Sequence, residues 1–219
     1  MSEIERFLPR YAAEPPQESV PYGRWADRLG SVFLEQVAEL EPDPDEPSEA
    51  DGIGEPGELA WFPDRTWHGR TFMPVTARTT TGLEVYGHVR FVPADEGGEP
   101  AALEADVDVT GEIAEDNPEW TIDLCETVVG AWRGDGDTAA MTLVWGRPMI
   151  NGAAFAVAEL DGIVVDRCPV INGVFTLLAP DDYHGDTLEV VATDRSGKEL
   201  ARESLYADDD EDGDDGDDG

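Results

Sequence analysis

The sequence of 219 residues is short of positive charge: it contains 13 arginines, and Lys198 is its only lysine. Fifty aspartates and glutamates give it a formal net charge of −36 at pH 7. Binding to nucleic acid needs lysine or arginine side chains that displace counterions from phosphates, and the chain has no stripe of such residues. The same shortage excludes binding to an anionic membrane surface. We therefore expect neither nucleic acid nor membrane as a direct partner.

Cysteine and histidine are also scarce, which bears on metal sites and disulfides. The two cysteines are Cys125 and Cys168, and the three histidines are His68, His88 and His184. None of them has a spacing typical of zinc sites, such as C-x-x-C or H-x-x-x-H. We expect free thiols that pack as small apolar groups, no metal site and no cofactor. The acidic stretch "DDYHGD" is expected to be a solvated turn and not a calcium site.

Long apolar runs and catalytic motifs are absent as well. No window approaches the roughly 18 apolar residues that a membrane-spanning helix needs. Residues 1–10 contain charges but no apolar stretch typical of a signal peptide. There is no G-x-S-x-G nucleophile elbow and no phosphate-binding glycine loop. These absences predict a soluble, cytoplasmic protein and favour a non-enzymatic function.

The acidity is spread along the chain and is not confined to its end. Nine acidic residues lie in 208–218, and the remaining 41 acids against 14 bases still leave a net charge of −27. Molar salt shortens the screening length to about 3 Å and removes most of the resulting self-repulsion. An excess of acids with almost no lysine resembles proteins of halophilic prokaryotes and, to a lesser degree, those of GC-rich bacteria. We expect a chain adapted to high salt, with a disordered acidic tail at 208–219.

The order of apolar and polar residues predicts an N-terminal helix ahead of a β-rich region. Residues 1–20 are expected to be an extended arm, and 41–57 an acidic linker rich in proline and glycine. Between them, apolar residues recur at helical spacing in 21–40 and predict one amphipathic helix, which would dock on a partner or on the chain's own strands. The apolar face of this helix consists of Trp25, Leu29, Phe33 and Val37.

From residue 58 onward the sequence alternates between apolar and polar residues, which is typical of strands. In 82–94 the polar set includes Tyr86, His88 and Arg90. We expect His88 to face solvent or a partner from the polar side of its strand. Similar alternation in 102–114, followed by further short apolar runs, predicts a mainly β fold with antiparallel strands.

Tight turns divide the second half of the chain into short strands. The dipeptides Asp161-Gly162 and Asn172-Gly173 strongly favour two-residue hairpin loops. Strands that recur every 8–12 residues, without helix-length gaps, are typical of β-sandwiches and barrels. We expect antiparallel β-sandwich or barrel modules, a first one at 58–150 and a second one at 151–207.

The turn pattern of the second module resembles that of a known class of domains. In 169–206, Asn-Gly, a proline-containing loop, Gly-Asp and "DRSGKE" follow one another between strands. This order resembles the later strands of immunoglobulin-like or transthyretin-like β-sandwich modules, such as carboxypeptidase regulatory-like domains. The resemblance extends over 153–207 and implies a spacer or a binding platform without catalysis.

The segment "WFPDRTWHGRTF" combines aromatic and basic residues in a chain that is otherwise poor in positive charge. Arginine and tryptophan two positions apart in a strand share a face, where the guanidinium can stack on the indole ring. One interpretation is a groove for an anionic or planar ligand or an acidic partner. The other is a core rim in which arginine stems cover tryptophan edges. The candidate binding residues are Trp61, Arg65, Trp67, His68 and Arg70.

Three functional hypotheses follow from these features. The first is a non-enzymatic binding or assembly protein that engages a protein partner or a second copy of itself. The second is a small-ligand-binding or hydrolytic β-barrel that uses residues 61–72. The third is an acidic mimic of nucleic acid that occupies a DNA-binding protein. Because no catalytic signature is present, we favour the first.

Overall fold

The computed structural model of the chain describes residues 19–44, 46–50, 52–94, 99–134, 137–181 and 187–205. Most of the expected N-terminal arm, the turn that contains His184 and the acidic tail at 208–219 lie outside these residues.

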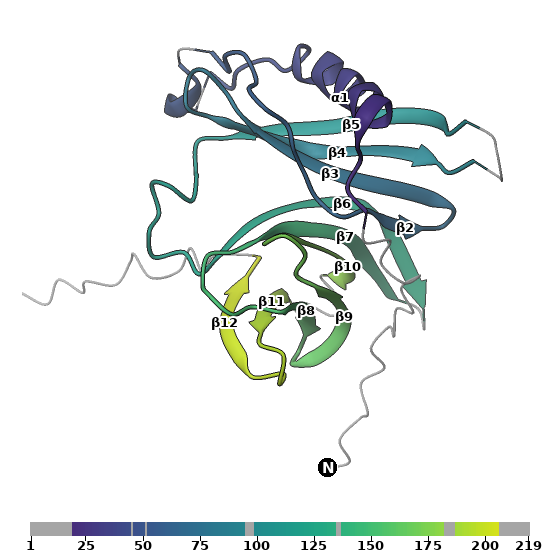
Figure 1. Cartoon of the computed structure of the whole chain (residues 1–219), viewed down its shortest axis with the longest axis vertical. Coiled ribbons are helices and arrows are strands. Elements are labelled where there is room, and N and C mark those ends of the chain that lie inside the picture. The colour runs from purple at the N-terminus through teal and green to yellow at the C-terminus, as the bar shows by residue number, and fades with distance from the viewer. Residues whose placement is uncertain are drawn as a thin grey trace, which may run out of the picture.

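Within the described residues the chain forms one α-helix, one short 3-10 helix and twelve strands (Figure 1). No helix in this part of the chain is both long and apolar enough to cross a membrane. The elements are α1 (Gly23–Val37), η1 (Pro47–Glu49), β1 (Ala60–Trp61), β2 (Arg65–Trp67), β3 (Arg70–Arg78), β4 (Glu84–Val92), β5 (Ala101–Thr110), β6 (Ile122–Gly134), β7 (Asp137–Pro148), β8 (Phe155–Leu160), β9 (Ile163–Pro169), β10 (Phe175–Asp181), β11 (Leu188–Thr193) and β12 (Glu199–Ser204).

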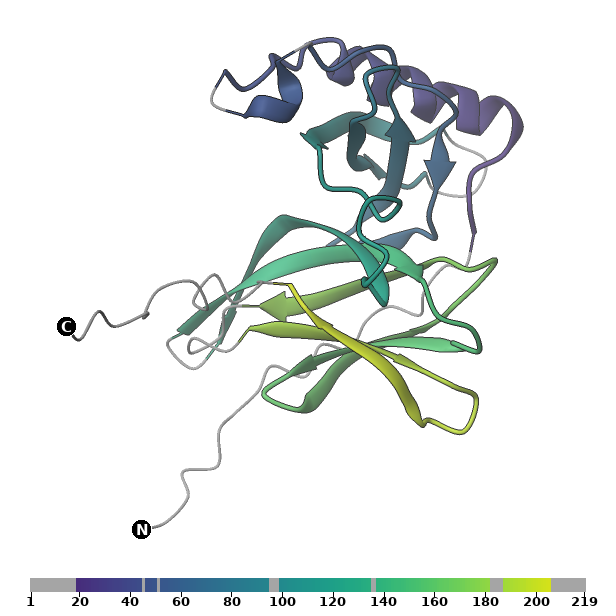
Figure 2. The same cartoon turned by 90° about the vertical axis from the view of Figure 1, so that its left-hand side faces the viewer.

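The strands form three antiparallel sheets that lie on one another, with α1 on the outer face of the first (Figures 1 and 2). The first sheet has the order β1-β3-β4-β5, with β2 also paired to β3. The middle sheet has the order β10-β7-β6, and the third sheet the order β12-β11-β8-β9. The expectation of a mainly β, antiparallel fold with one helix is confirmed. The strands β7 and β10 pair with each other, so the middle sheet contains strands from both of the modules expected at 58–150 and 151–207. The division of the chain into these two modules stays a prediction.

The helix α1 is amphipathic and packs its apolar face on the first sheet. Leu29, Phe33 and Val37 are buried in one cluster with side chains of β3 and β4. The half-buried ring of Trp25 lies edge-on to Phe91, with 5.1 Å between the ring centroids. Of the two docking alternatives for this helix, the structure therefore shows docking on the chain's own strands. Three of its four predicted contact residues are covered by that sheet.

The strand β4 follows the predicted alternation on one face and differs from it on the other. Val85 and Val89 point toward α1 as expected. His88 was expected to be exposed and is only 1% exposed, because the middle sheet covers this second face. Its ring lies 5.5 Å from that of Phe72, and neither ring nitrogen has a hydrogen-bond partner among the described residues. Burial lowers the pKa of His88 to about 4.

Two predicted turns adopt the backbone that their residues favour. Asp161 and Gly162, between β8 and β9, have φ angles of 50° and 71°. Asn172 and Gly173, between β9 and β10, have φ angles of 53° and 82°. Left-handed backbone is costly for most residues, but Asp, Asn and Gly tolerate it, which explains why these residues form the turns.

The strands β7 and β10 of the middle sheet are covered on both faces, so they carry apolar side chains on both sides. Toward the first sheet, Met141, Leu143 and Trp145 of β7 pack with Phe72. Toward the third sheet, Val144 packs with residues of β8, β10 and β11. Every residue of β10 is buried. Nearly continuous apolar runs in β7 and β10 are typical of strands that are covered on both faces.

A buried ion pair joins elements of all three sheets. Arg65 of β2 donates from Nη2 to Oδ2 of Asp166 in β9, and the side chains are 1% and 4% exposed. The same oxygen accepts a hydrogen bond from the backbone N–H of Leu178 in β10, at 2.8 Å. Because β2, β10 and β9 belong to the first, middle and third sheets, this contact fixes their relative positions.

Phe33→Ala is expected to destabilise the fold because it leaves a cavity between α1 and the first sheet. Loss of a buried phenylalanine ring costs about 3–5 kcal/mol of unfolding free energy. The control Leu34→Ala lies on the same helix at a position that is 40% exposed, and should change this free energy by less than about 0.5 kcal/mol. Urea denaturation measures both. Small effects of equal size would contradict the docking of α1 on the sheet.

Asp166→Asn is expected to cost about 3–5 kcal/mol of unfolding free energy, because it leaves the guanidinium of Arg65 buried without a counter-charge. Asparagine keeps an oxygen for the N–H of Leu178, so the loss reports the charge. The double variant Arg65→Met/Asp166→Asn removes both charges and should be more stable than Asp166→Asn alone. A double-mutant cycle of unfolding free energies measures the coupling, and simple additivity would show that the pair is not coupled.

Candidate functional site

The five candidate binding residues predicted from the sequence do not form one pocket. Trp61 packs against the cluster on the helix side of the first sheet, whereas Arg65 is buried in its ion pair with Asp166. Trp67 packs on the opposite side, and its ring is so close to Gly130 of β6 that a Cβ atom there would lie 2.2 Å from Cζ3. These three side chains therefore pack within the fold.

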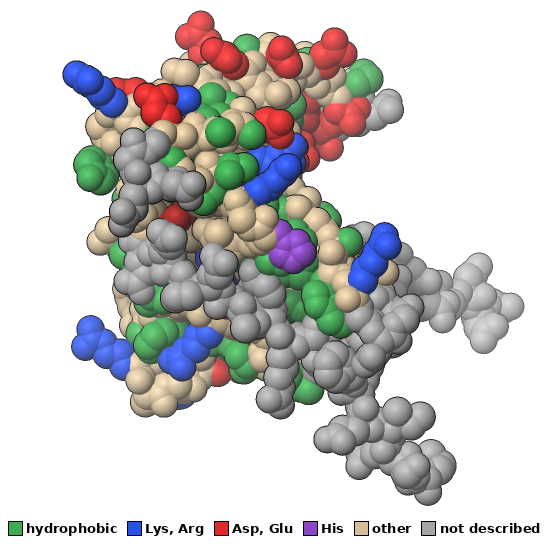
Figure 3. Space-filling model, turned by 90° about the vertical axis from the view of Figure 1, so that its right-hand side faces the viewer, with side chains coloured by type: hydrophobic (Ala, Val, Ile, Leu, Met, Phe, Trp, Pro, Cys, Tyr) green, Lys and Arg blue, Asp and Glu red, His purple; other side chains and the backbone are tan. Residues whose placement is uncertain are grey.

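His68 and Arg70 lie at the tip of the β2–β3 hairpin and are exposed. His68 and Gly69 form its turn, with φ angles of 49° and 72°. The His68 ring stacks on Trp67 at 4.2 Å between centroids, and Arg70 pairs in register with Trp67. The structure thus brings Trp67, His68 and Arg70 together. On this side of the molecule, basic, histidine and hydrophobic side chains lie below a group of acidic side chains (Figure 3).

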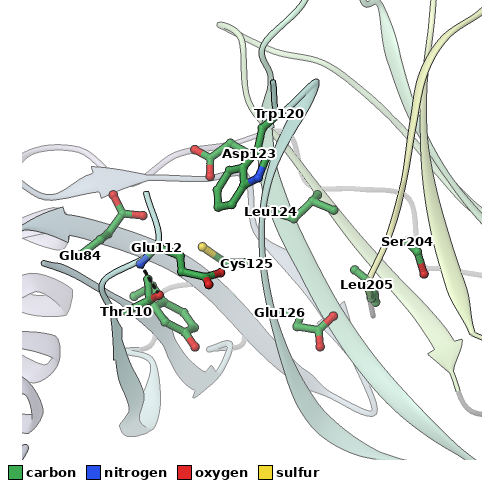
Figure 4. Close-up of a pocket in the computed structure, with 11 residues that line it drawn as sticks. Glu84, Thr110, Glu112, Trp120, Asp123, Leu124, Cys125, Glu126, Ser204 and Leu205 are labelled. Atoms are coloured by element: carbon green, nitrogen blue, oxygen red, sulfur yellow. Dashed lines mark hydrogen bonds between the residues drawn. The ribbon is translucent and has the colours of Figure 1, made fainter. Parts of the chain in front are cut away.

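A pocket of about 210 Å³ lies between β4 of the first sheet and β6, the edge strand of the middle sheet (Figure 4). We call it the inter-sheet pocket. Its walls come from β4, from the end of β5 and the turn that follows, from β6 and the residues before it, and from the end of β12. Most of its side chains are half-buried. The lining residues are Glu84, Tyr86, Thr110, Glu112, Trp120, Asp123, Leu124, Cys125, Glu126, Ser204 and Leu205.

The alternation along β6 sends its side chains to two sides of the strand. Asp123 and Cys125 point toward the first sheet, where Glu84 lies (Figure 4). Leu124 and Glu126 point to the other side of the strand, toward β12 (Figure 4). The inter-sheet pocket therefore extends around the edge of β6, and its carboxylates lie on both sides of that strand.

Burial disfavours ionisation of the two carboxyl groups on the first-sheet side of the pocket. It raises the pKa of Glu84, and the charge of the nearby Asp123 adds to this effect. Burial also raises the pKa of Asp123, against the opposing effect of Arg147. Arg78 contacts Glu84 with 3.9 Å between Nε and Oε2. Two arginines thus offset part of the negative charge, yet both carboxyl groups keep a raised pKa.

On the other side of β6, no described positive group offsets the charge of Glu126. Burial, and then the charge of Asp181, raise the pKa of Glu126 to about 7. Its Oε2 atom is buried and has no hydrogen-bond partner among the described residues. A buried carboxylate oxygen without a partner is costly, which explains why the ionised form is disfavoured.

The inter-sheet pocket holds no group that is activated for nucleophilic attack. Burial raises the pKa of the Cys125 thiol well above its ordinary value and the pKa of the Tyr86 hydroxyl to about 12, so both stay protonated near neutral pH. No histidine is among the lining residues. Across the described ranges, no three His, Cys, Asp or Glu side chains are arranged to hold a metal ion. The thiol and the phenol of this pocket are therefore protonated groups that can contact a ligand.

Sequence reasoning did not find this pocket. Its walls combine residues between 84 and 126 with residues 204 and 205, which no local pattern connects. In a chain with 50 acidic residues, no pair of carboxylates stands out by composition. The usable signal was the alternation in 120–126, which places Asp123 and Cys125 on one face of a strand that begins two residues after Trp120.

Glu126→Gln is expected to stabilise the protein at neutral pH. With a folded-state pKa of about 7 against an ordinary value of 4.5, Glu126 disfavours folding increasingly as the pH rises through this interval. Below pH 4.5 the carboxyl group is protonated in both states, so variant and wild type should melt alike. Thermal unfolding at a series of pH values checks this, with Glu35→Gln on the exposed side of α1 as control. A difference that does not vary with pH would disprove the assignment.

No family model, no curated protein and no solved structure matches the chain. The resemblance of residues 153–207 to immunoglobulin-like or transthyretin-like modules therefore stays a prediction. Carboxylates, aromatic rings and a thiol lie together around β6, which makes this region the candidate functional site.

Proposed function

We propose that this chain is a non-enzymatic binding protein whose three sheets form the scaffold and whose inter-sheet pocket holds a small ligand. One observation carries the proposal: half-buried carboxylates and aromatic rings from two separate stretches of chain, 84–86 and 120–126, converge on this pocket. Half-buried polar groups that converge on an aromatic pocket are typical of ligand sites. The protonated thiol and phenol favour binding over catalysis.

The size of the inter-sheet pocket favours a small ligand. Its volume of about 210 Å³ is below the roughly 300–1,000 Å³ of sites for drug-sized molecules. A wider hollow of about 560 Å³ lies between η1 and the end of β5, but most of its side chains are exposed, and its polar wall consists largely of carboxylates such as Glu41, Asp43 and Glu46. Solvated acidic loops are common in so acidic a chain, so this hollow supports no binding function.

In this proposal the acidic surface is an adaptation to high salt, and recognition takes place elsewhere. Acidic side chains gather at one end of the side that Figure 3 shows, where a few basic and hydrophobic ones lie among them. The exposed His68 and Arg70, with the half-buried Trp67 beneath the His68 ring, are the candidate surface for a protein partner or a second copy, because they join aromatic rings to positive charge. The immunoglobulin-like resemblance, which implies a binding platform, fits the same reading.

A screen of a small-molecule library by nitrogen-15 NMR tests the proposal. A ligand of the inter-sheet pocket should shift the amide signals of residues 84–86 and 122–126 together. Trp120→Ala should abolish these shifts, whereas Val128→Ala, at a 61% exposed position on the same strand β6, should leave them unchanged. If no compound of any charge shifts these signals, or if shifts gather only at residues 67–70, the inter-sheet pocket is not the binding site.

A further inference from the structure

We propose that the ligand of the inter-sheet pocket is a small organic cation, held between the carboxylates of Glu84 and Asp123 and the ring of Trp120. This inference rests on the proposed function, because it names the class of ligand for the same pocket. It is carried by the charge of the walls, by their aromatic rings and by polar atoms that lack partners.

The charge of the walls favours a positive ligand. Glu84 on β4 and Asp123 on β6 line the same pocket from two different sheets, and the charge of Asp123 acts on Glu84. The exposed carboxylate of Glu112 adds negative charge at the rim. A neutral or anionic ligand in the pocket would displace water that hydrates these carboxylates and would offer no positive charge in its place, which is energetically costly. A cation would add counter-charge to the part that Arg78 and Arg147 already supply.

Other carboxylates of the chain accept hydrogen bonds in exposed positions, and their pKa values are lowered. Asp194 accepts hydrogen bonds from Ser196 in an exposed turn, and its pKa is lowered. Glu199 is paired with Arg202 by a contact of 2.7 Å, and its pKa is lowered too, chiefly by this hydrogen bond. In the inter-sheet pocket the shift has the opposite sign, although arginines are near. Burial is the chief cause of this difference and acts on Asp64 outside the pocket as well, so what distinguishes Glu84 and Asp123 is that they line one pocket together with aromatic rings.

The aromatic rings distinguish an organic cation from a metal ion. Trp120 and Tyr86 line the pocket together with the carboxylates, and a cation is attracted to the face of such rings, most strongly to that of tryptophan. A metal ion would need several oxygen, nitrogen or sulfur ligands close together, and the described part of the chain offers no such group of three. An amine or quaternary ammonium group uses rings and carboxylates at once.

A buried donor behind the pocket wall also lacks a partner. Trp145 is fully buried, pairs in register with Cys125, and its ring centroid lies 6.3 Å from that of Tyr86. Its Nε1 atom has no hydrogen-bond partner among the described residues. Oε2 of Glu126, which lines the pocket on the other side of β6, also has no hydrogen-bond partner among the described residues. Buried polar atoms are normally paired, so a lining acceptor without a partner favours a positively charged ligand that can approach it.

Titration calorimetry with a matched pair of probes tests the charge of the ligand. Choline and 3,3-dimethylbutan-1-ol have nearly the same shape, but only choline is charged. At constant ionic strength, set by exchanging sodium chloride for choline chloride, choline should bind at least about tenfold more tightly, as expected for a charge-assisted contact. Tetramethylammonium, which lacks the hydroxyl group, should bind as well.

Two variants separate specific binding from general attraction to an acidic surface. Asp123→Asn keeps the shape of the side chain and should weaken choline binding by about tenfold or more. Glu35→Gln, on the exposed side of α1, removes the same charge and should leave affinity unchanged. Equal losses in both variants would reduce the effect to counter-ion attraction and overturn the inference. An unchanged unfolding midpoint for Asp123→Asn excludes misfolding as the cause.

The remaining outcomes distinguish failure of this inference from failure of the proposed function. If both probes bind equally and NMR shifts appear at residues 84–86 and 122–126, the pocket binds ligands but does not select charge. If neither choline nor tetramethylammonium binds while a neutral or anionic compound from the library does, the cation is wrong and the pocket stands. If no compound binds there at all, both are wrong.

Discussion

The contact among Arg65, Asp166 and the N–H of Leu178 is the interaction on which the arrangement of the sheets depends. One carboxylate oxygen receives a guanidinium from the first sheet and a backbone N–H from the middle sheet, while its own strand belongs to the third. Breaking such a contact leaves a buried charge or donor without a partner, which is far more costly than losing an exposed ion pair. The relative position of three sheets is therefore specified by polar geometry in addition to apolar packing.

The interface between the first and middle sheets is apolar at its centre and polar around it. Phe72, Met141 and Leu143 form a buried cluster, but the ring nitrogens of the buried His88 and Trp145 have no hydrogen-bond partner among the described residues. The layers between α1 and the first sheet and between the middle and third sheets are built mainly from aliphatic side chains. A pocket with half-buried carboxylates at the edge of this same interface is consistent with its mixed character.

Acidic side chains of this chain lie in two different environments. Most acidic residues in the described part of the chain are exposed to solvent, where salt screens them and where arginines such as Arg202 pair with several carboxylates at once. A few lie at the inter-sheet pocket, where burial removes water and the screening that goes with it. The same residue type is thus hydrated in one setting and, in the other, has a pKa that burial raises. The net charge calculated from the composition does not distinguish these two environments.

Local patterns in the sequence determined the strands, the helix and the tight turns, because periodicity and backbone preference act over a few residues. The apolar face of α1 and the turns at Asp161-Gly162 and Asn172-Gly173 follow from such patterns alone. Only the tertiary structure decided that His88 is buried, that Arg65 pairs with a residue 101 positions away, and that a pocket opens beside β6. These depend on which face of each sheet another sheet covers. That is a matter of long-range pairing and packing, which no alternation within one strand can express.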